Sequence, residues 1–194
     1  MAQKLDLRII KTEREIKKAF LALLQKKDFE KITINDIAQE ALVGKVTFYN
    51  HYADKYDLAD KIVQEKLKQY KDLLHKRVNI VSHSNFKKPS FNDFLPKAQY
   101  LLSEFAILSK IHTSEINFES QVKKTIAQEY KHLIQNTPQL KIKDPSMVAQ
   151  LLAAVAFEYF ERYIKDTHQP NPKILNDQLS GLIQAINYFF RPKT

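Results

Sequence analysis

The stretch VGKVTFYNHY, from Val43 to Tyr52, concentrates side chains that could contact nucleic acid. Threonine and tyrosine hydroxyls can donate hydrogen bonds to phosphate oxygens, and a lysine can neutralise phosphate charge. Asparagine can make a paired hydrogen bond to adenine, and an aromatic ring or a threonine methyl can pack on a thymine methyl. Such side chains can act together only if one helix presents them on an exposed face.

Two short helices joined by a turn would provide that face. Apolar residues at helical spacing predict a first helix over residues 8–27. Thr33, followed three residues later by Asp36, predicts a capping box that opens a second helix over 34–40. A third helix is predicted over 45–52, so the second and third form a helix-turn-helix, in which the last helix can enter a DNA major groove.

Helical spacing divides the third helix into two faces. Val46, Phe48 and Tyr52 are predicted to point largely inward, since residues three and four apart share a face. The outward residues are then Lys45, Thr47, Tyr49, Asn50 and His51. A plainer alternative is that Tyr49 and His51 only close the core of three helices.

Helical periodicity continues through the rest of the chain and predicts an all-α fold. Asp54 is placed to cap a fourth helix that ends near residue 78, and the polar residues 79–93 are expected to connect two modules. Further helices are predicted from 94 to about 111 and over 120–135. Asp144 with Pro145, and Asn171 with Pro172, open two very apolar helices. The predicted domains are a DNA-binding module, 1–56, and a larger helical bundle, 57–194.

Composition excludes several other functions. The chain has two glycines and no cysteine, so glycine-rich phosphate loops, disulfides and thiolate metal sites are not expected. His112 with Glu115 is only a weak hint of metal binding; no metal, no cofactor and no enzymatic activity are predicted. The formal net charge is +9, but residues 1–60 hold 11 basic against 10 acidic side chains. No segment is apolar enough to span a membrane, and a cytoplasmic location is expected.

Residues 11–67, most sharply TINDIAQEALVGKVTFYNHYADKYDL, resemble the DNA-binding domain of the TetR family of bacterial transcriptional regulators. The resemblance implies that Lys45, Thr47, Tyr49 and His51 contact DNA and that Asn50 occupies a variable recognition position. The whole segment from Lys45 to His51, Val46 included, is therefore expected to bind the operator. Lys55 would contact a phosphate at the start of the fourth helix, and Thr33 would cap a helix whose first amides face another phosphate.

Two residues depart from the family pattern in the turn. Leu42 stands where the family usually has glycine, and Gly44 stands where it usually has serine or another capping residue. A leucine in a left-handed turn costs about 1 kcal/mol, so the turn is expected to be strained. The form TFYNHYADKYDL also resembles a subgroup that activates dihydroxyacetone kinase operons through a partner protein. An activator or scaffold with weak operator binding is therefore the alternative to a repressor.

The family architecture implies a homodimer whose bundle binds a small-molecule effector. Dimerisation is expected through the helices at about 145–165 and 172–190, although these two helices could instead bury each other within a monomer. A dimer would place two recognition helices about 34–36 Å apart on a palindromic operator. Candidates to line the effector pocket, each of which could equally be a core residue, are Tyr70, Tyr100, Phe105, His112, Phe118, Tyr130 and Tyr159.

Overall fold

The computed structural model describes residues 7–83, 100–101, 103–113, 116–137 and 140–165, with positions 177, 180–182, 184–185 and 188–189. The fold is all-α, as predicted, and the described residues contain no strand, only an isolated bridge between His112 and Asn117. The elements are α1 (Leu7–Lys26), η1 (Phe29–Lys31), α2 (Ile34–Glu40), α3 (Lys45–Tyr49), α4 (Lys55–His83), α6 (Phe118–Gln135) and α7 (Pro145–Lys165).

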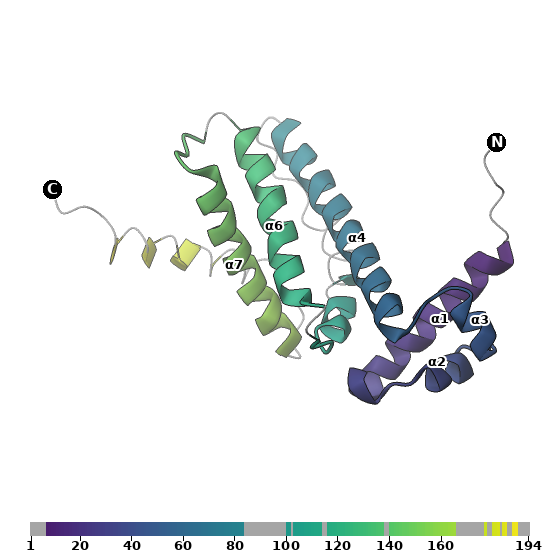
Figure 1. The fold of residues 1–194 in the computed structure, drawn as a ribbon. Helices are drawn as coiled ribbons and strands as arrows, with labels where there is room; N and C mark the ends of the chain where they lie inside the picture. Colours follow the sequence, from purple (N-terminus) through teal and green to yellow (C-terminus); the bar gives the residue numbers. More distant parts are fainter. Residues whose placement is uncertain are drawn as a thin grey trace, which may run out of the picture.

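The helices form a small head and a longer bundle (Figure 1). The head consists of α1, α2 and α3, which gather around the start of α4. The bundle places α4, α6 and α7 side by side, and residues 103–108 add a helical segment near α4 and α6. Because α4 runs from the head along the bundle, it is the element that both parts share.

One continuous core joins the head to the bundle. Ile16, Phe20 and Phe48 from the head belong to the same buried cluster as Phe105 and Phe157 from the bundle. Six apolar residues at helical spacing predict the buried face of the first helix; five of them, at 16, 19, 20, 23 and 24, are buried, whereas the sixth, Ile9, is 45% exposed. The division into domains 1–56 and 57–194 stays a prediction.

Local signals place several helix starts where the sequence predicts them. Thr33 Oγ1 accepts a hydrogen bond from Asp36 N at 3.1 Å, and Thr33 N donates to Asp36 Oδ2 at 3.0 Å, which completes the capping box of α2. Asp54 Oδ1 accepts hydrogen bonds from two amides at the start of α4. Asp144 Oδ1 accepts one from Met147 N at 3.0 Å, and α7 begins at Pro145.

Two predicted helix ends are wrong. The third helix ends at Tyr49 rather than at residue 52, because residues 50 and 51 form a turn. The fourth helix continues to His83, so residues 79–83 are helical and do not belong to a connector. The rest of that connector (84–93), the predicted helix over 94–99 and the start at Asn171 and Pro172 lie outside the described residues.

The turn between α2 and α3 adopts the strained conformation that the sequence predicts. Leu42 has a φ of 56°, and its side chain is 93% exposed. The turn is closed by Leu42 N and Val43 N, which donate to the carbonyls of Gln39 and Ala38 at 3.1 and 2.9 Å. The left-handed backbone conformation of Leu42 is therefore sterically unfavourable, and its exposed side chain buries no apolar surface that would offset this.

Replacing Leu42 with glycine is expected to raise the free energy of unfolding by about 0.5 to 1 kcal/mol. The relief of steric strain exceeds the extra backbone entropy that glycine loses on folding. The measurement is urea denaturation followed by circular dichroism. Leu42→Ala is the matched control, because alanine removes the exposed side chain but keeps the Cβ atom. Equal stabilisation by both substitutions would contradict the explanation.

Candidate nucleic-acid interface

The recognition helix α3 is anchored by one buried ring. Phe48 is fully buried, and its ring lies 5.6 Å from that of Tyr52, which is 3% exposed. These two inward positions are as predicted, but Val46 is 75% exposed, and its predicted inward orientation is wrong. A helix of five residues has only a narrow buried side, which Phe48 fills. Burial raises the pKa of the Tyr52 hydroxyl, which therefore stays neutral at physiological pH.

The opposite side of α3 carries the side chains that the sequence predicts to be outward. Lys45 and Asn50 are exposed, Tyr49 is 55% exposed, and Thr47 is half-buried. Gly44 is the N-cap of α3 and supplies no side-chain cap. The exposed surface thus offers an ammonium, a phenol hydroxyl and an amide within about two helical turns. Val46 adds an apolar side chain to it, which suits a thymine methyl.

His51 departs from the predicted outward arrangement. Its side chain is only 11% exposed, and Nδ1 lies 3.5 Å from Glu13 Oε1 of α1. His51 lies in the turn after Tyr49, where its ring faces Glu13 of α1. The predicted outward orientation of His51 is therefore wrong. Glu13, which no local sequence signal identifies as a partner, pairs with it across the head.

The start of α2 is capped and carries a negative charge. Hydrogen bonds from the Thr33 main chain and hydroxyl, and then the neighbouring Lys27, hold the pKa of Asp36 below its usual value. Because the pKa is depressed in the folded state, the stabilisation is complete above a pH of about 4 and is lost as the pH falls further. Lys27 Nζ lies 3.3 Å from Asp36 Oδ1. A phosphate contact at Thr33 stays a prediction.

Lys55 occupies a different environment from the one that the resemblance implies. Its Nζ donates hydrogen bonds to the carbonyls of Phe29, Glu30 and Ile32 at 3.0, 3.1 and 3.1 Å. The side chain is 14% exposed. An ammonium has three donors, and all three are used within the protein. In this structure the ammonium of Lys55 thus binds main-chain carbonyls, and a phosphate contact at Lys55 stays a prediction.

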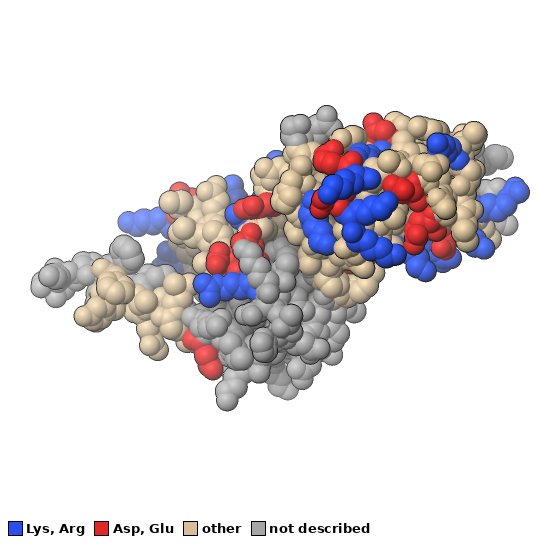
Figure 2. Space-filling view, turned by 90° about the horizontal axis from the view of Figure 1, so that it is seen from below, with Lys and Arg blue, Asp and Glu red and all other residues tan. Residues whose placement is uncertain are grey.

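Basic side chains do not form a single stripe on the face shown in Figure 2. Lys and Arg lie interspersed with Asp and Glu over the head. Ion pairs in the head include Lys31 with Asp28 at 2.7 Å and Lys61 with Asp57 at 2.9 Å. The charges on this face of the head therefore attract DNA only weakly over long distances. DNA affinity must then come from contacts made by individual side chains.

Four of the candidates for an effector pocket belong to or pack against the buried core, and the pocket itself stays a prediction. Tyr70 packs against Phe105 with ring centroids 5.5 Å apart, and Phe105 packs against Phe118 at 5.1 Å. Phe105 and Phe118 are 1% and 3% exposed, and Tyr130 is partly buried against the same core. Tyr100 is 60% exposed. His112 is also exposed, and the side chain of Tyr159 lies outside the described residues.

Buried carboxylates are a feature of the bundle that sequence reasoning missed. Glu104 is paired with Lys66, which lies 2.9 and 2.8 Å from its two oxygens, and accepts a hydrogen bond from the Tyr100 hydroxyl. Glu129 is 5% exposed and lies 2.8 Å from His75 Nε2. Each pair joins α4 to a segment far along the chain, and no local pattern marks such partners.

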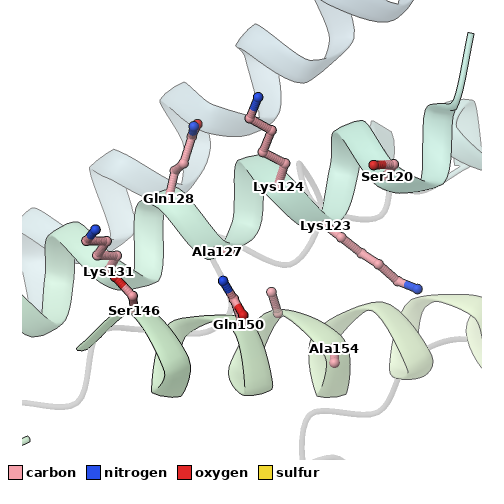
Figure 3. Close-up of a pocket in the computed structure, with 10 residues that line it drawn as sticks. Ser120, Lys123, Lys124, Ala127, Gln128, Lys131, Ser146, Gln150 and Ala154 are labelled. Atoms are coloured by element: carbon pink, nitrogen blue, oxygen red, sulfur yellow. The ribbon is translucent and has the colours of Figure 1, made fainter. Parts of the chain in front are cut away.

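An open groove of about 480 Å³ lies between α6 and α7 (Figure 3). Lys123, Lys124 and Lys131 line it from α6, and none of its ten lining residues is acidic. Lys123 extends toward α7, where its ammonium lies 4.4 Å from the centre of the Phe157 ring. None of the seven aromatic and histidine candidates lines this groove.

Neither a metal site nor a membrane span is found among the residues that the structure describes. Among the described residues, no group of three or more His, Asp or Glu side chains could hold a metal ion. Within the same residues, no helix is long and apolar enough to cross a membrane.

Comparisons with known proteins agree with this geometry. Residues 16–62 match the family model described as bacterial regulatory proteins, tetR family. A relative, the uncharacterized HTH-type transcriptional regulator YxbF of Bacillus subtilis (strain 168), is 36% identical over 73 residues. That alignment covers 37% of this chain but only 19% of the relative.

Two solved structures have a similar fold along almost the whole chain. One is a Mesorhizobium loti MAFF303099 protein assigned to the TetR family of transcriptional regulators; the TM-score is 0.68 at 16% identity, covering 93% of this chain and 97% of that one. The other is the dihydroxyacetone kinase operon activator DhaS; the TM-score is 0.59 at 20% identity, covering 90% and 94%. The family match and the helix-turn-helix identify residues 16–62 as a DNA-binding domain of the TetR type, and the chain as a whole shares the fold of these two structures.

Proposed function

We propose that this regulator is a homodimeric repressor that binds a palindromic operator and is released by a small-molecule effector. It acts in the cytoplasm and catalyses no reaction. The observation that carries the proposal is the division of α3 into a buried and an exposed side. Phe48 is fully buried, whereas Lys45, Val46, Tyr49 and Asn50 are exposed. Those four side chains are the proposed operator contacts, with Thr47 at their edge.

Exposed apolar side chains on α7 support the homodimer. Met147 and Leu151 are 54% and 57% exposed, and Leu152 and Val155 are 41% and 36% exposed. Contiguous apolar surface of this kind is typical of an interaction site, and burying it against a second copy would remove it from water. Toward the C-terminus, Leu182, Tyr188 and Phe189 are also exposed in the described residues.

The experiment is selection of bound duplexes from a random DNA pool by the wild-type chain and a Tyr49→Ala variant. We expect the wild type to enrich an inverted repeat, because a two-fold dimer presents the same helix to two half-sites. The variant should lose that enrichment. Leu140→Ala is the control, since Leu140 is 48% exposed and lies between α6 and α7, away from the head. Enrichment of a sequence without two-fold symmetry would contradict a dimeric reader.

A second candidate function is an activator or scaffold that works through a partner protein. The groove between α6 and α7 favours it, because three lysines and no acidic residue line a surface that an acidic segment could occupy. The same selection separates the two functions. A folded, dimeric chain that enriches no sequence would make the partner-dependent function the leading one.

A further inference from the structure

The groove between α6 and α7 carries charge of one sign. Its ten lining residues are three lysines, two glutamines, two serines and three alanines, with no acidic residue among them. Lys123, Lys124 and Lys131 all belong to α6. A cleft lined by one sign of charge concentrates ions of the opposite sign, so the groove attracts anions.

Two of the three ammonium groups are available to a ligand. Lys123 forms an ion pair with Glu119 and lies over the Phe157 ring. Among the residues that the structure describes, Lys124 and Lys131 have no acidic partner, and both are exposed. An anion would therefore meet these two lysines without first breaking an existing ion pair.

The spacing of these two lysines sets the length of the ligand. Lys124 and Lys131 lie seven residues apart on one side of α6, a rise of about 10 Å. Gln128 lies between them, and Gln150 of α7 points toward α6 across the groove (Figure 3). Two separated acidic groups would thus each meet a lysine, with glutamine amides as further donors. A volume of about 480 Å³ suits a small molecule.

The groove lies on a different side of α7 from the apolar surface that supports the homodimer. Ser146 and Gln150 follow helical spacing on the groove side. Met147, Leu151 and Val155 follow similar spacing roughly a third of a turn further round the helix. A second copy packed against the apolar surface therefore does not need to cover the groove.

Another side of α6 contacts α4, which leads to the head. Gln64 Nε2 of α4 donates a hydrogen bond to Gln121 Oε1 at 2.9 Å, and Glu129 Oε2 lies 2.8 Å from His75 Nε2 of α4. The start of α4 lies beside the helices of the head (Figure 1). A ligand held between α6 and α7 therefore acts on a helix that is tied to the element shared by head and bundle.

We propose that the groove between α6 and α7 binds a small-molecule dianion whose acidic groups are about 10 Å apart, and that this dianion is the effector. Its action on DNA rests on the proposed function, whereas its binding to the groove does not. The proposal places the effector on the surface of the bundle, away from the seven aromatic and histidine candidates.

Calorimetric titration of the full chain with decanedioate tests the binding. This linear dicarboxylate is the probe because its acidic ends can reach both lysines. Lys124→Gln and Lys131→Gln are each expected to weaken binding about fivefold, as for an exposed ion pair. Lys68→Gln is the matched control, since Lys68 is an exposed lysine of α4 that does not line the groove. Butanedioate is too short to reach both lysines and should bind about fivefold more weakly than decanedioate.

Several results would overturn the dianion site. They are the absence of binding at millimolar decanedioate, equal affinity for the two dicarboxylates, and equal affinity of the three lysine variants. A short polyglutamate peptide is the third probe. If it binds through Lys124 and Lys131 more tightly than decanedioate does, the occupant is an acidic protein segment, and the second candidate function gains support instead.

Release from DNA tests the role as effector. The probe is a fluorescent duplex carrying the inverted repeat enriched by the wild-type chain, titrated with and without saturating decanedioate. Operator affinity of the wild type is expected to fall about tenfold, whereas the double variant Lys124→Gln with Lys131→Gln should not respond. Binding without release would refute the effector role. If the wild type enriches no repeat, the proposed function fails, and calorimetry still decides whether the groove binds a dianion.

Discussion

Replacing Phe48 with alanine is expected to lower the free energy of unfolding by about 4 kcal/mol. The ring is fully buried in the core and is the only buried side chain of α3. Large aromatic deletions in cores remove transfer free energy and leave a cavity, which together amount to about 3 to 5 kcal/mol. The measurement is urea denaturation followed by far-ultraviolet circular dichroism, with the midpoint and slope fitted together.

Tyr49→Ala is the matched control for Phe48→Ala. The two aromatic residues are neighbours, but Tyr49 is 55% exposed, so its loss should change the free energy of unfolding by less than about 0.5 kcal/mol. Both variants should lose operator binding, for different reasons: one loses the anchor of α3 and the other a contact. Similar destabilisation by the two substitutions would show that Phe48 is not the anchor.

Replacing Lys66 with methionine is expected to destabilise the fold by about 3 kcal/mol. Lys66 and Glu104 are 12% and 11% exposed, so removal of the lysine leaves a carboxylate largely out of water without its partner. Breaking such a pair costs about 3 to 5 kcal/mol, and the lower end applies here because some solvent access remains. The hydrogen bond from the Tyr100 hydroxyl stays but carries no positive charge.

The double variant Lys66→Met with Glu104→Met separates the penalty of an unpaired charge from the value of the pair. Two apolar side chains of similar volume should recover most of the lost stability, because the desolvated charges are gone. Thermal and urea unfolding of the two single variants and the double variant form a complete cycle. Additive losses would show that Lys66 and Glu104 do not interact energetically.

Local sequence signals predicted the helix starts well. Thr33 with Asp36, and Asp144 with Pro145, are recognisable because cap and helix lie within three residues of each other. The positive φ of Leu42 fits what the resemblance implies, because Leu42 stands where the family usually has a glycine in the turn. Each of these features depends on neighbours in the chain.

Side-chain orientation in the candidate site was predicted less well. Helical spacing placed Val46 inward and His51 outward, and the structure reverses both. Val46 lies within α3, whose five residues bury only Phe48, and His51 lies in the turn after Tyr49. Where the helix ends depends on how Phe48 and Tyr52 pack against the rest of the head, and residue types alone do not give that packing.

The sequence by itself determined the helical fold, the helix-turn-helix and the exposed positions Lys45, Tyr49 and Asn50, because caps and apolar spacing act over a few residues. Tertiary structure alone decided the partners of Lys55, His51 and Lys66. Their contacts join residues between 23 and 38 positions apart. Burial makes those contacts necessary, because a buried donor without an acceptor is destabilising. The ammonium of Lys55 would face solvent or phosphate on an isolated helix, but it donates to three carbonyls when folding brings them within 3.1 Å.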